Sequence, residues 1–239
     1  MIDFFTSKKW LIISPHADDA ELGCGGAMSR AVENDIEVHI AVVTIKGEWH
    51  VRNGIYVSSE TRKKELTNAM LEAGATLHII NKINDNEDFD LCSSSKSRCV
   101  NAIDLLIENI KPDIIFIPVP SFHQEHKWVY ECSIAATRTT KNADSPKSVI
   151  AYEYPPAGWG DSGSWSQSSG SIYVDISKHL ERKISILGKH ESQMSNVENS
   201  LISLDAVRRL ASFRGLESSV NYAELFLSLI HISEPTRPY

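Results

Sequence analysis

The sequence predicts an α/β fold: a Rossmann-like, mostly parallel sheet with helices on both faces, in a single domain. Short apolar runs of strand length alternate with segments of helical periodicity along the chain, which is the pattern of βαβ units. Most of these runs are apolar at consecutive positions, as expected for strands buried on both faces. The length agrees, because 239 residues suit one α/β domain with a sizeable core.

The predicted elements alternate in order along the chain. The strand candidates are residues 11–14, 36–43, 77–80, 114–117, 149–152 and 172–174. The helix candidates are residues 21–34, 59–73, 97–110, 128–139, 177–190 and 196–211. Ser58 or Ser59 is a suitable N-cap for the second helix, and Gly74 is a suitable residue to end it.

Two loops combine polar and aromatic residues. Residues 44–50 leave the second strand and suit the wall of a pocket. Residues 155–170 are rich in Pro, Gly, Ser and Trp, which is typical of a functional loop in a compact domain. The tryptophans Trp49, Trp159 and Trp165 either stack on a sugar ring or pack within their own loops.

Composition and charge narrow the class of protein. The chain is 42% hydrophobic and 23% charged, which is ordinary for a globular domain. A net charge of −7 disfavours a nucleic-acid partner, which would require a basic face. There is no signal-peptide pattern and no apolar run near the roughly 20 residues of a membrane span. The four cysteines lack CxxC spacing and indicate free thiols, so we expect a cytoplasmic protein.

The last residues differ from the rest of the chain. From Leu227 on, the sequence resembles the translation of a common transposon-based DNA-sequencing adapter. We therefore expect the domain to cover residues 1–226 and residues 227–239 to be a non-native tail. The alternative is a native C-terminal segment.

The turn between the first predicted strand and the first predicted helix contains His16, Asp18 and Asp19. In a parallel sheet this turn lies at the carboxyl edge, where ligands bind. His16 and Asp19 are three residues apart, so their side chains can converge on one point. Nitrogen and oxygen donors together suit Zn²⁺ or another borderline divalent metal. Asp18 would then be free to act on water, or one aspartate simply caps the helix.

A second turn at the same edge follows the strand at residues 114–117 and contains His123 and His126. With His16 and Asp19, four candidate ligands share one rim. A catalytic zinc site uses three protein ligands and leaves one position for water. One of these residues, or Asp18, therefore has another task, and the spacing alone does not say which.

With both turns, the sequence resembles the LmbE/PIG-L-like zinc-dependent de-N-acetylases. Their pattern is a Pro/Ala-His-x-Asp-Asp turn, a glycine-rich segment and a distal His-x-x-His. The corresponding stretches here are Pro15-His16-Ala17-Asp18-Asp19, Gly23-Cys24-Gly25-Gly26 and His123-Gln124-Glu125-His126. Weaker matches extend the resemblance over residues 8–226: Arg62-Lys63-Lys64-Glu65, Val174-Asp175-Ile176-Ser177, Lys189-His190-Glu191-Ser192-Gln193, Arg214-Gly215 and Tyr222-Ala223-Glu224.

The resemblance implies a task for each matched site residue. Zn²⁺ would be bound by His16, Asp19 and His126, although the same ligands would accept Fe²⁺ or Co²⁺. Asp18 would be the general base, His123 would polarise the carbonyl and protonate the leaving amine, and Arg62 would hold the substrate.

One position departs from the family pattern. Where the family often has Pro-Asp inside the second motif, this chain has Gln124-Glu125. The resemblance gives the carboxylate at this position the task of orienting His123, and Glu125 is one methylene longer than Asp. Because family members often assemble, the resemblance also admits a homo-oligomer.

The implied function is metal-dependent hydrolysis of the N-acetyl group of a GlcNAc-type sugar or sugar conjugate, which releases acetate and a free amine. The alternative is a zinc amidase that acts on a non-sugar or thiol-conjugate amide. A third reading, a nucleotide-binding module whose aspartates hold Mg²⁺, is disfavoured by the His-x-x-His turn because Mg²⁺ prefers oxygen ligands. The identity of the sugar is left open.

Overall fold

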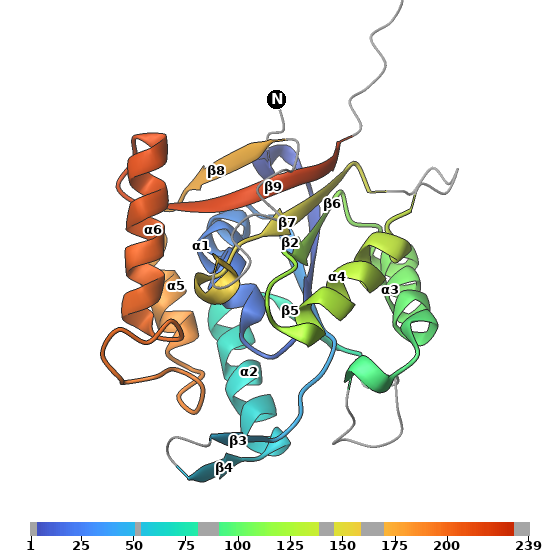
Figure 1. The fold of residues 1–239 in the computed structure, drawn as a ribbon. Helices are drawn as coiled ribbons and strands as arrows, with labels where there is room; N and C mark the ends of the chain where they lie inside the picture. Colours follow the sequence, from blue (N-terminus) through green and yellow to red (C-terminus); the bar gives the residue numbers. More distant parts are fainter. Residues whose placement is uncertain (1–3, 51–53, 81–90, 139–145, 159–169, 232–239) are drawn as a thin grey trace, which may run out of the picture.

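The predicted strands form the centre of a seven-stranded sheet. The structure is a computed structural model that describes residues 4–50, 54–80, 91–138, 146–158 and 170–231. The strand order is β5-β2-β1-β6-β7-β9-β8 (Figure 1). The first five of these strands are parallel to one another, and β9 is antiparallel to β7 and β8. The strands are β1 (Lys9–Ser14), β2 (Glu37–Val42), β5 (Thr76–Ile79), β6 (Ile114–Pro118), β7 (Ser148–Tyr152), β8 (Ser171–Asp175) and β9 (Ala223–His231).

Helices cover both faces of the sheet, as predicted. The central strand β1 shows why: Trp10 and Ile12 belong to one apolar cluster, while Leu11 and Ile13 belong to a second cluster on the other face. The first cluster includes residues of α1, α2 and α5, and the second includes residues of α3 and α4 (Figure 1). The helices are α1 (Asp19–Glu33), α2 (Ser59–Ala73), α3 (Lys96–Ile110), α4 (Gln124–Ala136), α5 (Leu180–Leu187) and α6 (Leu204–Ser218).

The strand order fixes where a ligand can bind. From β1 the chain builds outward through β2 to β5, and it then returns to build from β6 to β7 on the other side of β1. The order therefore reverses between β1 and β6, and ligands of open α/β sheets bind at this switch point, beyond the carboxyl ends of the strands. The two predicted motif turns follow these two strands, so the topology brings them together.

The second helix agrees closely with its prediction. The side chain of Ser58 accepts a hydrogen bond from the backbone N–H of Thr61 and caps α2. Gly74 ends the helix in the left-handed region at φ 73°, where a residue without Cβ is favoured.

Helix α4 begins earlier than predicted. It starts at Gln124 instead of after Trp128, and His123 occupies its N-cap position. The prediction assigned the whole His-x-x-His stretch to a turn. Glu125 favours the earlier start, because a carboxylate in the first turn interacts well with the helix dipole. His126 therefore projects from a helix, which fixes its backbone.

The last two predicted helices are also displaced. Helix α5 starts at Leu180 because Asp175 accepts hydrogen bonds from the N–H and the hydroxyl of Ser177, which holds a turn there. Helix α6 starts at Leu204, where Ser203 accepts from the N–H of Ala206. In both cases local side-chain bonds, which hydrophobic periodicity does not report, decide where the helix begins.

Two strand features were not predicted. Part of the loop at residues 44–50 is β3 (Glu48–His50), which pairs with β4 (Ile55–Val57) in an antiparallel hairpin. Strand β9 crosses the predicted domain boundary at residue 226. Residues 81–90, 159–169 and 232–239, and with them Trp159 and Trp165, lie outside the described part of the chain.

Helix α1 lies very close to the elements beside it. A Cβ at Gly23 would be 2.2 Å from the ring atom Cδ2 of Tyr152, and a Cβ at Gly26 would be 2.7 Å from Cγ2 of Ile176. Both neighbours are buried core residues. The glycine-rich segment is therefore a packing surface that lets α1 approach Tyr152 and Ile176 closely.

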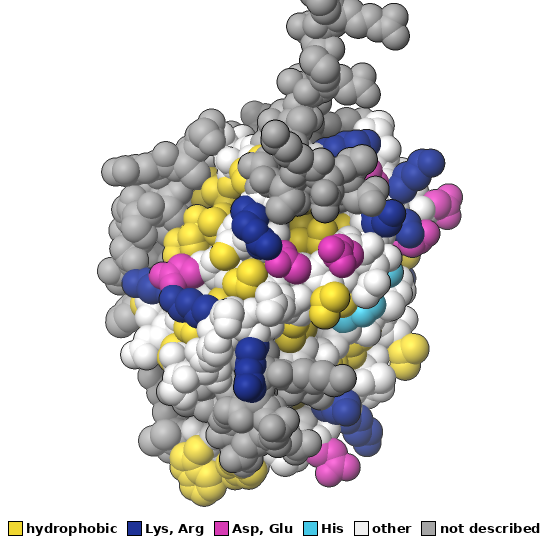
Figure 2. Space-filling model, turned by 90° about the vertical axis from the view of Figure 1, so that its right-hand side faces the viewer, with side chains coloured by type: hydrophobic (Ala, Val, Ile, Leu, Met, Phe, Trp, Pro, Cys, Tyr) yellow, Lys and Arg dark blue, Asp and Glu magenta, His cyan; other side chains and the backbone are white. Residues whose placement is uncertain are grey.

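The described surface carries charges of both signs. Figure 2 shows the face that carries α3 and α4, where acidic and basic side chains of the described residues are interspersed without a continuous basic area. Over the described residues, none of the helices has both the length and the apolar character needed to cross a membrane.

Candidate metal and catalytic site

Local hydrogen bonds shape the turn that follows β1. The hydroxyl of Ser14 donates to the carbonyl of His16 over 2.6 Å and accepts from the N–H of Ala20 over 3.1 Å. The N–H of His16 donates to Oδ2 of Asp19 over 2.9 Å. These bonds fold the chain back on itself, so that Nδ1 of His16 lies 3.1 Å from the same oxygen. The three-residue spacing thus converges as predicted.

The first turn of α4 brings His126 to this point. Its Nε2 lies 3.2 Å from Oδ2 of Asp19 and 3.3 Å from Nδ1 of His16. The three atoms form a nearly equilateral triangle, although His126 is 110 residues from His16 in the chain. The structure therefore joins the two motifs at the switch point of the sheet.

This triangle fits a divalent metal ion. Zinc holds nitrogen and oxygen ligands at about 2.0–2.2 Å in tetrahedral sites, so two of its ligands lie roughly 3.3–3.5 Å apart. The spacings of 3.1–3.3 Å among His16, Asp19 and His126 are close to this value. The two ring nitrogens and the carboxylate oxygen face one another in a buried place, and one divalent ion could be bound by all three.

The charges around the triangle also favour a cation. Burial lowers the pKa of His16, but its hydrogen bonds to Asp19 and Glu125 outweigh burial and raise the pKa to about 9. Burial raises the pKa of Asp19, and the neighbouring His126 and His16 outweigh it and hold the pKa well below its usual range. The site thus stabilises positive charge beside an ionised carboxylate.

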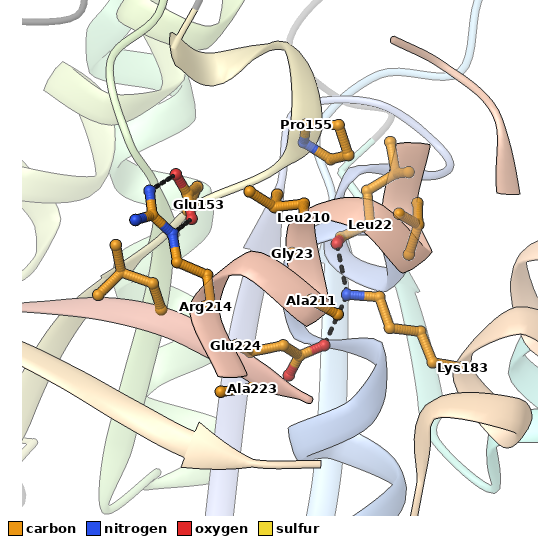
Figure 3. Close-up of a pocket in the computed structure, with 12 residues that line it drawn as sticks. Leu22, Gly23, Glu153, Pro155, Lys183, Leu210, Ala211, Arg214, Ala223 and Glu224 are labelled. Carbon is orange, nitrogen blue, oxygen red and sulfur yellow. Dashed lines mark hydrogen bonds and ion pairs between the residues drawn. The ribbon is translucent and has the colours of Figure 1, made fainter. Parts of the chain in front are cut away.

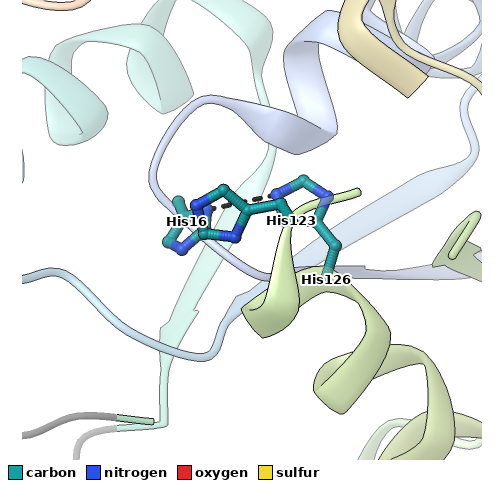
Figure 4. Close-up of side chains that lie close together, drawn as sticks. All are labelled: His16, His123 and His126. Carbon is teal, nitrogen blue, oxygen red and sulfur yellow. Dashed lines mark hydrogen bonds between the residues drawn. The ribbon is translucent and has the colours of Figure 1, made fainter. Parts of the chain in front are cut away.

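His123 completes a group of three histidines. Ligand atoms of His16, His123 and His126 all lie within 4.8 Å of one another (Figure 4). Nδ1 of His123 is buried and has no hydrogen-bond partner. Burial first, and then the neighbouring histidines, lower the pKa of His123 to about 4. The imidazole is therefore neutral at pH 7 and able to accept a proton.

Glu125 does not have the partner that the resemblance implied. Its Oε2 lies 2.7 Å from Nε2 of His16, and its Oε1 accepts from Nζ of Lys46 over 2.7 Å. The carboxylate therefore orients His16, not His123, and the longer side chain provides the reach. Burial raises the pKa of Glu125, but the bonds from His16 and Lys46 outweigh it and lower the pKa to about 2.

Lys46 is a site residue that the sequence analysis missed. It lies in the segment between β2 and β3, which was predicted to form a pocket wall, but a single lysine in a polar loop carries no recognisable spacing. Its carbonyl also accepts a hydrogen bond from Arg62 over 3.1 Å. Both its side chain and its backbone are thus attached to the site.

Asp18 lies at the N-cap position of α1, but its side chain makes no capping hydrogen bond. The capping alternative therefore does not account for this residue. It is buried, and burial together with the adjacent Asp19 raises its pKa. The charges of His190 and Arg62 act in the opposite direction. Asp18 is thus a carboxylate held next to the triangle and away from bulk water.

Arg62 is 4% exposed and projects from α2 toward the segment that contains Lys46. Its guanidinium lies 3.4 Å from the carboxylate of Glu48, and its Nε is buried without a partner. The structure therefore places Arg62 beside the loop at the rim. On the same hairpin, Trp49 is 59% exposed, with its ring centroid 6.3 Å from that of Tyr56.

A buried pair lies behind this turn. Nε2 of His190 is 2.9 Å from Oε1 of Glu21, and both side chains are fully buried. His190, from the matched stretch Lys189–Gln193, thus contacts the first turn of helix α1, which also contains Asp19.

A small cleft elsewhere in the molecule is not the candidate site. Its lining includes the ion pairs Lys183–Glu224 and Arg214–Glu153 (Figure 3). Its volume of about 10 Å³ has room for at most about one water molecule. None of the histidines of the candidate site lines it.

Comparison with known proteins identifies the family. The model of the PIG-L family, described as GlcNAc-PI de-N-acetylase, matches residues 11–137, a range that includes both motifs. The chain belongs to the PIG-L family. It is 26% identical over 194 residues to an uncharacterized deacetylase, YaiS, of Escherichia coli (strain K12), a match that covers 77% of this chain and 91% of that protein.

Further relatives agree with this membership. The chain is 25% identical over 223 residues to the diacetylchitobiose deacetylase of Thermococcus kodakarensis, covering 91% of this chain and 81% of that protein. The fold is similar to that of the zinc-inhibited form of the teicoplanin deacetylase Orf2, with a TM-score of 0.76, 16% identity and coverage of 96% and 100% of the two chains. The predicted family and fold class are thus confirmed.

Proposed function

We propose that this protein is a metal-dependent de-N-acetylase that hydrolyses the N-acetyl group of a GlcNAc-type sugar or sugar conjugate. The observation that carries this proposal is the convergence of His16, Asp19 and His126 on one point at the switch point of the sheet. Membership of the PIG-L family and the deacetylase relatives support the class of reaction.

His16, Asp19 and His126 would hold the metal ion, and we propose Zn²⁺ because of their mixed nitrogen and oxygen donors. Bound there, Zn²⁺ would polarise the acetamide carbonyl and lower the pKa of water to about 7. Fe²⁺ and Co²⁺ accept the same ligands, so the metal in the cell is to be identified by measurement.

Asp18 and His123 would transfer the protons that the hydrolysis requires. Asp18 accepts a proton from the water that attacks the acetamide carbon. His123, at the N-cap of α4, polarises the carbonyl through its ring N–H. Because its ring is neutral at pH 7, it first takes up the proton that Asp18 removes from water, and it then delivers this proton to the amide nitrogen as the carbon–nitrogen bond breaks, because an unprotonated amine leaves poorly. Acetate and a free amine result, and one proton taken up is matched by one released.

Substrate binding is assigned to the rim. The buried Nε of Arg62 lacks a partner and is able to donate to a sugar hydroxyl. The exposed ring of Trp49 offers a face on which a sugar can stack. The hydrogen bond of Arg62 to Lys46, its ion pair with Glu48 and the ring contact of Trp49 with Tyr56 all lie outside the triangle of His16, Asp19 and His126. This placement suits a role in substrate binding and not in bond breaking.

We further propose a cytoplasmic location and a domain that covers residues 1–226, with residues 227–239 non-native. None of the four cysteines forms a disulfide, which supports a reducing compartment. A homo-oligomer is proposed from the resemblance alone, and size-exclusion chromatography with light scattering tests it.

Acetate release by the purified protein tests the reaction. The substrates are a panel of N-acetylated sugars and disaccharides, compared with N-acetylated amines that lack a sugar, and each is assayed before and after removal of metal by a chelator. Release from the sugars that is lost with the metal and restored by Zn²⁺ supports the proposal. Release from the non-sugar amides alone would favour the amidase alternative, and release that survives chelation would contradict a metal-dependent reaction.

A further inference from the structure

We propose that Lys46 is a positioning residue for the metal ligand His16 and acts through Glu125. The inference rests on the proposed function, since it assumes that His16 binds the metal. It concerns this chain in particular, because the glutamate at position 125 and the lysine that reaches it meet in this structure.

The two nitrogens of the His16 ring have different partners. Nδ1 is the atom that faces Asp19 and His126, and Nε2 faces Glu125. An imidazole binds a metal through an unprotonated nitrogen, and a carboxylate on the other nitrogen fixes which one carries the proton. Glu125 therefore keeps a proton on Nε2, so that a metal bound at the other nitrogen would replace only the proton on Nδ1.

Both carboxylate oxygens of Glu125 are held by hydrogen bonds. Its side chain is 6% exposed, and each of its two oxygens has one partner at 2.7 Å, His16 on one side and Lys46 on the other. A glutamate has one more rotatable bond than an aspartate, so it loses more conformational entropy when it is fixed. The charged bond from Lys46 fixes the second oxygen and with it the carboxylate plane that His16 meets.

Lys46 is itself held in place through its backbone. Its carbonyl accepts from the guanidinium of Arg62, which is buried in α2. The Lys46 side chain is 32% exposed, so it lies at the rim of the site, where its ammonium group contacts Oε1 of Glu125. The chain Arg62, Lys46, Glu125 and His16 thus connects helix α2 to the metal ligand by successive hydrogen bonds.

The test compares Zn²⁺ affinity of the metal-free protein and of its Lys46→Met variant, measured by competition with a chromogenic chelator. We expect the variant to bind Zn²⁺ about 10–100-fold more weakly, the range typical of lost outer contacts to a metal ligand. Lys46→Arg should restore affinity to within a few-fold of the parent. Lys64→Met, at an exposed position of α2, is the matched control and should leave affinity unchanged.

A double-mutant comparison separates positioning from a general effect of charge. In a Glu125→Gln background, Lys46→Met should cause no more than about a twofold further loss, because its partner is already changed. Equal losses in both backgrounds, or Lys46→Met affinity within twofold of the parent, would overturn the inference. If the parent bound no Zn²⁺ at all, the proposed metal site would fail instead. Should Lys46→Met not fold, the Lys46→Gln variant gives the same comparison.

Discussion

Each ring nitrogen of His16 has its own partner, and this division is the feature on which the site depends. Nδ1 meets Asp19 and His126, whereas Nε2 meets Glu125. One nitrogen therefore faces the other candidate ligands, and the other nitrogen faces a carboxylate that can fix the orientation of the ring. At the scale of single residues, the site therefore has an inner set of side chains that converge, His16, Asp19 and His126, and an outer set that contacts His16 from the other side, Glu125 and its partner Lys46.

Asp18→Asn should retain the metal and lose activity. The substitution preserves size and leaves the triangle of His16, Asp19 and His126 intact, but it removes the group that accepts a proton from water. We expect kcat to fall on the order of 10²–10⁴-fold, with Zn²⁺ content near that of the parent. Steady-state acetate release and metal analysis of the same sample measure both, and near-full activity would show that Asp18 is not the base.

His126→Ala should lose both metal and activity. It removes one corner of the triangle and leaves Asp19 and His16 as a pair, which is too few ligands for a typical catalytic zinc site. Metal content after purification without added metal is the measurement. His179→Ala, on a histidine that pairs with Glu33 at the surface, is the control and should keep its metal; an unchanged metal content in His126→Ala would remove His126 from the ligand set.

The convergence of the two motif turns was predictable from the sequence, the choice of His126 over His123 as a ligand rested on the family resemblance, and the contacts of Glu125 and Lys46 were not predictable. His16, Asp19 and His126 follow two strands at short spacings, and the convergence of such turns follows from a parallel sheet. The partner of Glu125 depends on the rotamer of a long side chain and on where α4 begins, and spacing reports neither. Lys46 belongs to no pattern, so only coordinates reveal its contact.

Helix α1 is the element that links the site to the core. Its first turn contains Asp19, and its glycine-rich middle lies against Tyr152 and Ile176. The prediction placed this helix to within about two residues, because the change from an apolar run to a polar turn marks its start. The reason for its glycines appears only when neighbouring elements are present.

Gly23→Ala should destabilise the protein. Alanine normally stabilises a helix interior by roughly 0.5–1 kcal/mol relative to glycine, but here the new Cβ would be 2.2 Å from the buried ring of Tyr152. Because overpacking of a core typically costs about 1–3 kcal/mol, we expect a net loss. The measurement is the free energy of unfolding in urea. Gly170→Ala, where nothing lies within 4 Å of the new Cβ, is the control; equal stabilities would refute the packing role of Gly23.

At the scale of the whole molecule, the sheet has a functional edge and a structural edge. The carboxyl ends of β1 and β6 carry the site, and the remaining strands supply the frame. Fold class, strand alternation and the location of the site were predictable because they follow from periodicity. Strand β9 was not predicted because residues from Leu227 on were set aside as a non-native tail, and the hairpin β3–β4 was not predicted because a short exposed pair of strands gives a weak pattern.

Global stability should fall on acidification partly because of a histidine pair in the frame. Nδ1 of His39 lies 3.0 Å from Nε2 of His78, and burial lowers the pKa of both rings below 6.5. The unfolded chain therefore binds more protons near pH 6 than the folded chain does. The stability from this pair is complete above about pH 6.5 and is lost as pH falls through the lowered folded values. Glu37 beside His39 opposes this effect, and Lys9 adds to it.

Thermal unfolding at about pH 7.5 and about pH 5.5 measures this effect. We expect the difference in Tm between the two conditions to be smaller in the double variant His39→Gln, His78→Gln than in the parent. His50→Gln, on the hairpin, is the control and should keep the parent's difference. A double variant that loses as much Tm as the parent would exclude the pair as a source of the pH dependence.

The buried pair Lys183–Glu224 has a consequence for biosynthesis. Glu224 accepts from the N–H groups of Gly26 and Ala27, in the middle of α1, and Lys183 donates both to Glu224 and to the carbonyl of Leu22. A nascent chain on the ribosome lacks these partners until translation has passed residue 224. Helix α1, which presents Asp19, thus gains these buried partners only after nearly 200 further residues have been made, so it cannot reach its final surroundings early in synthesis.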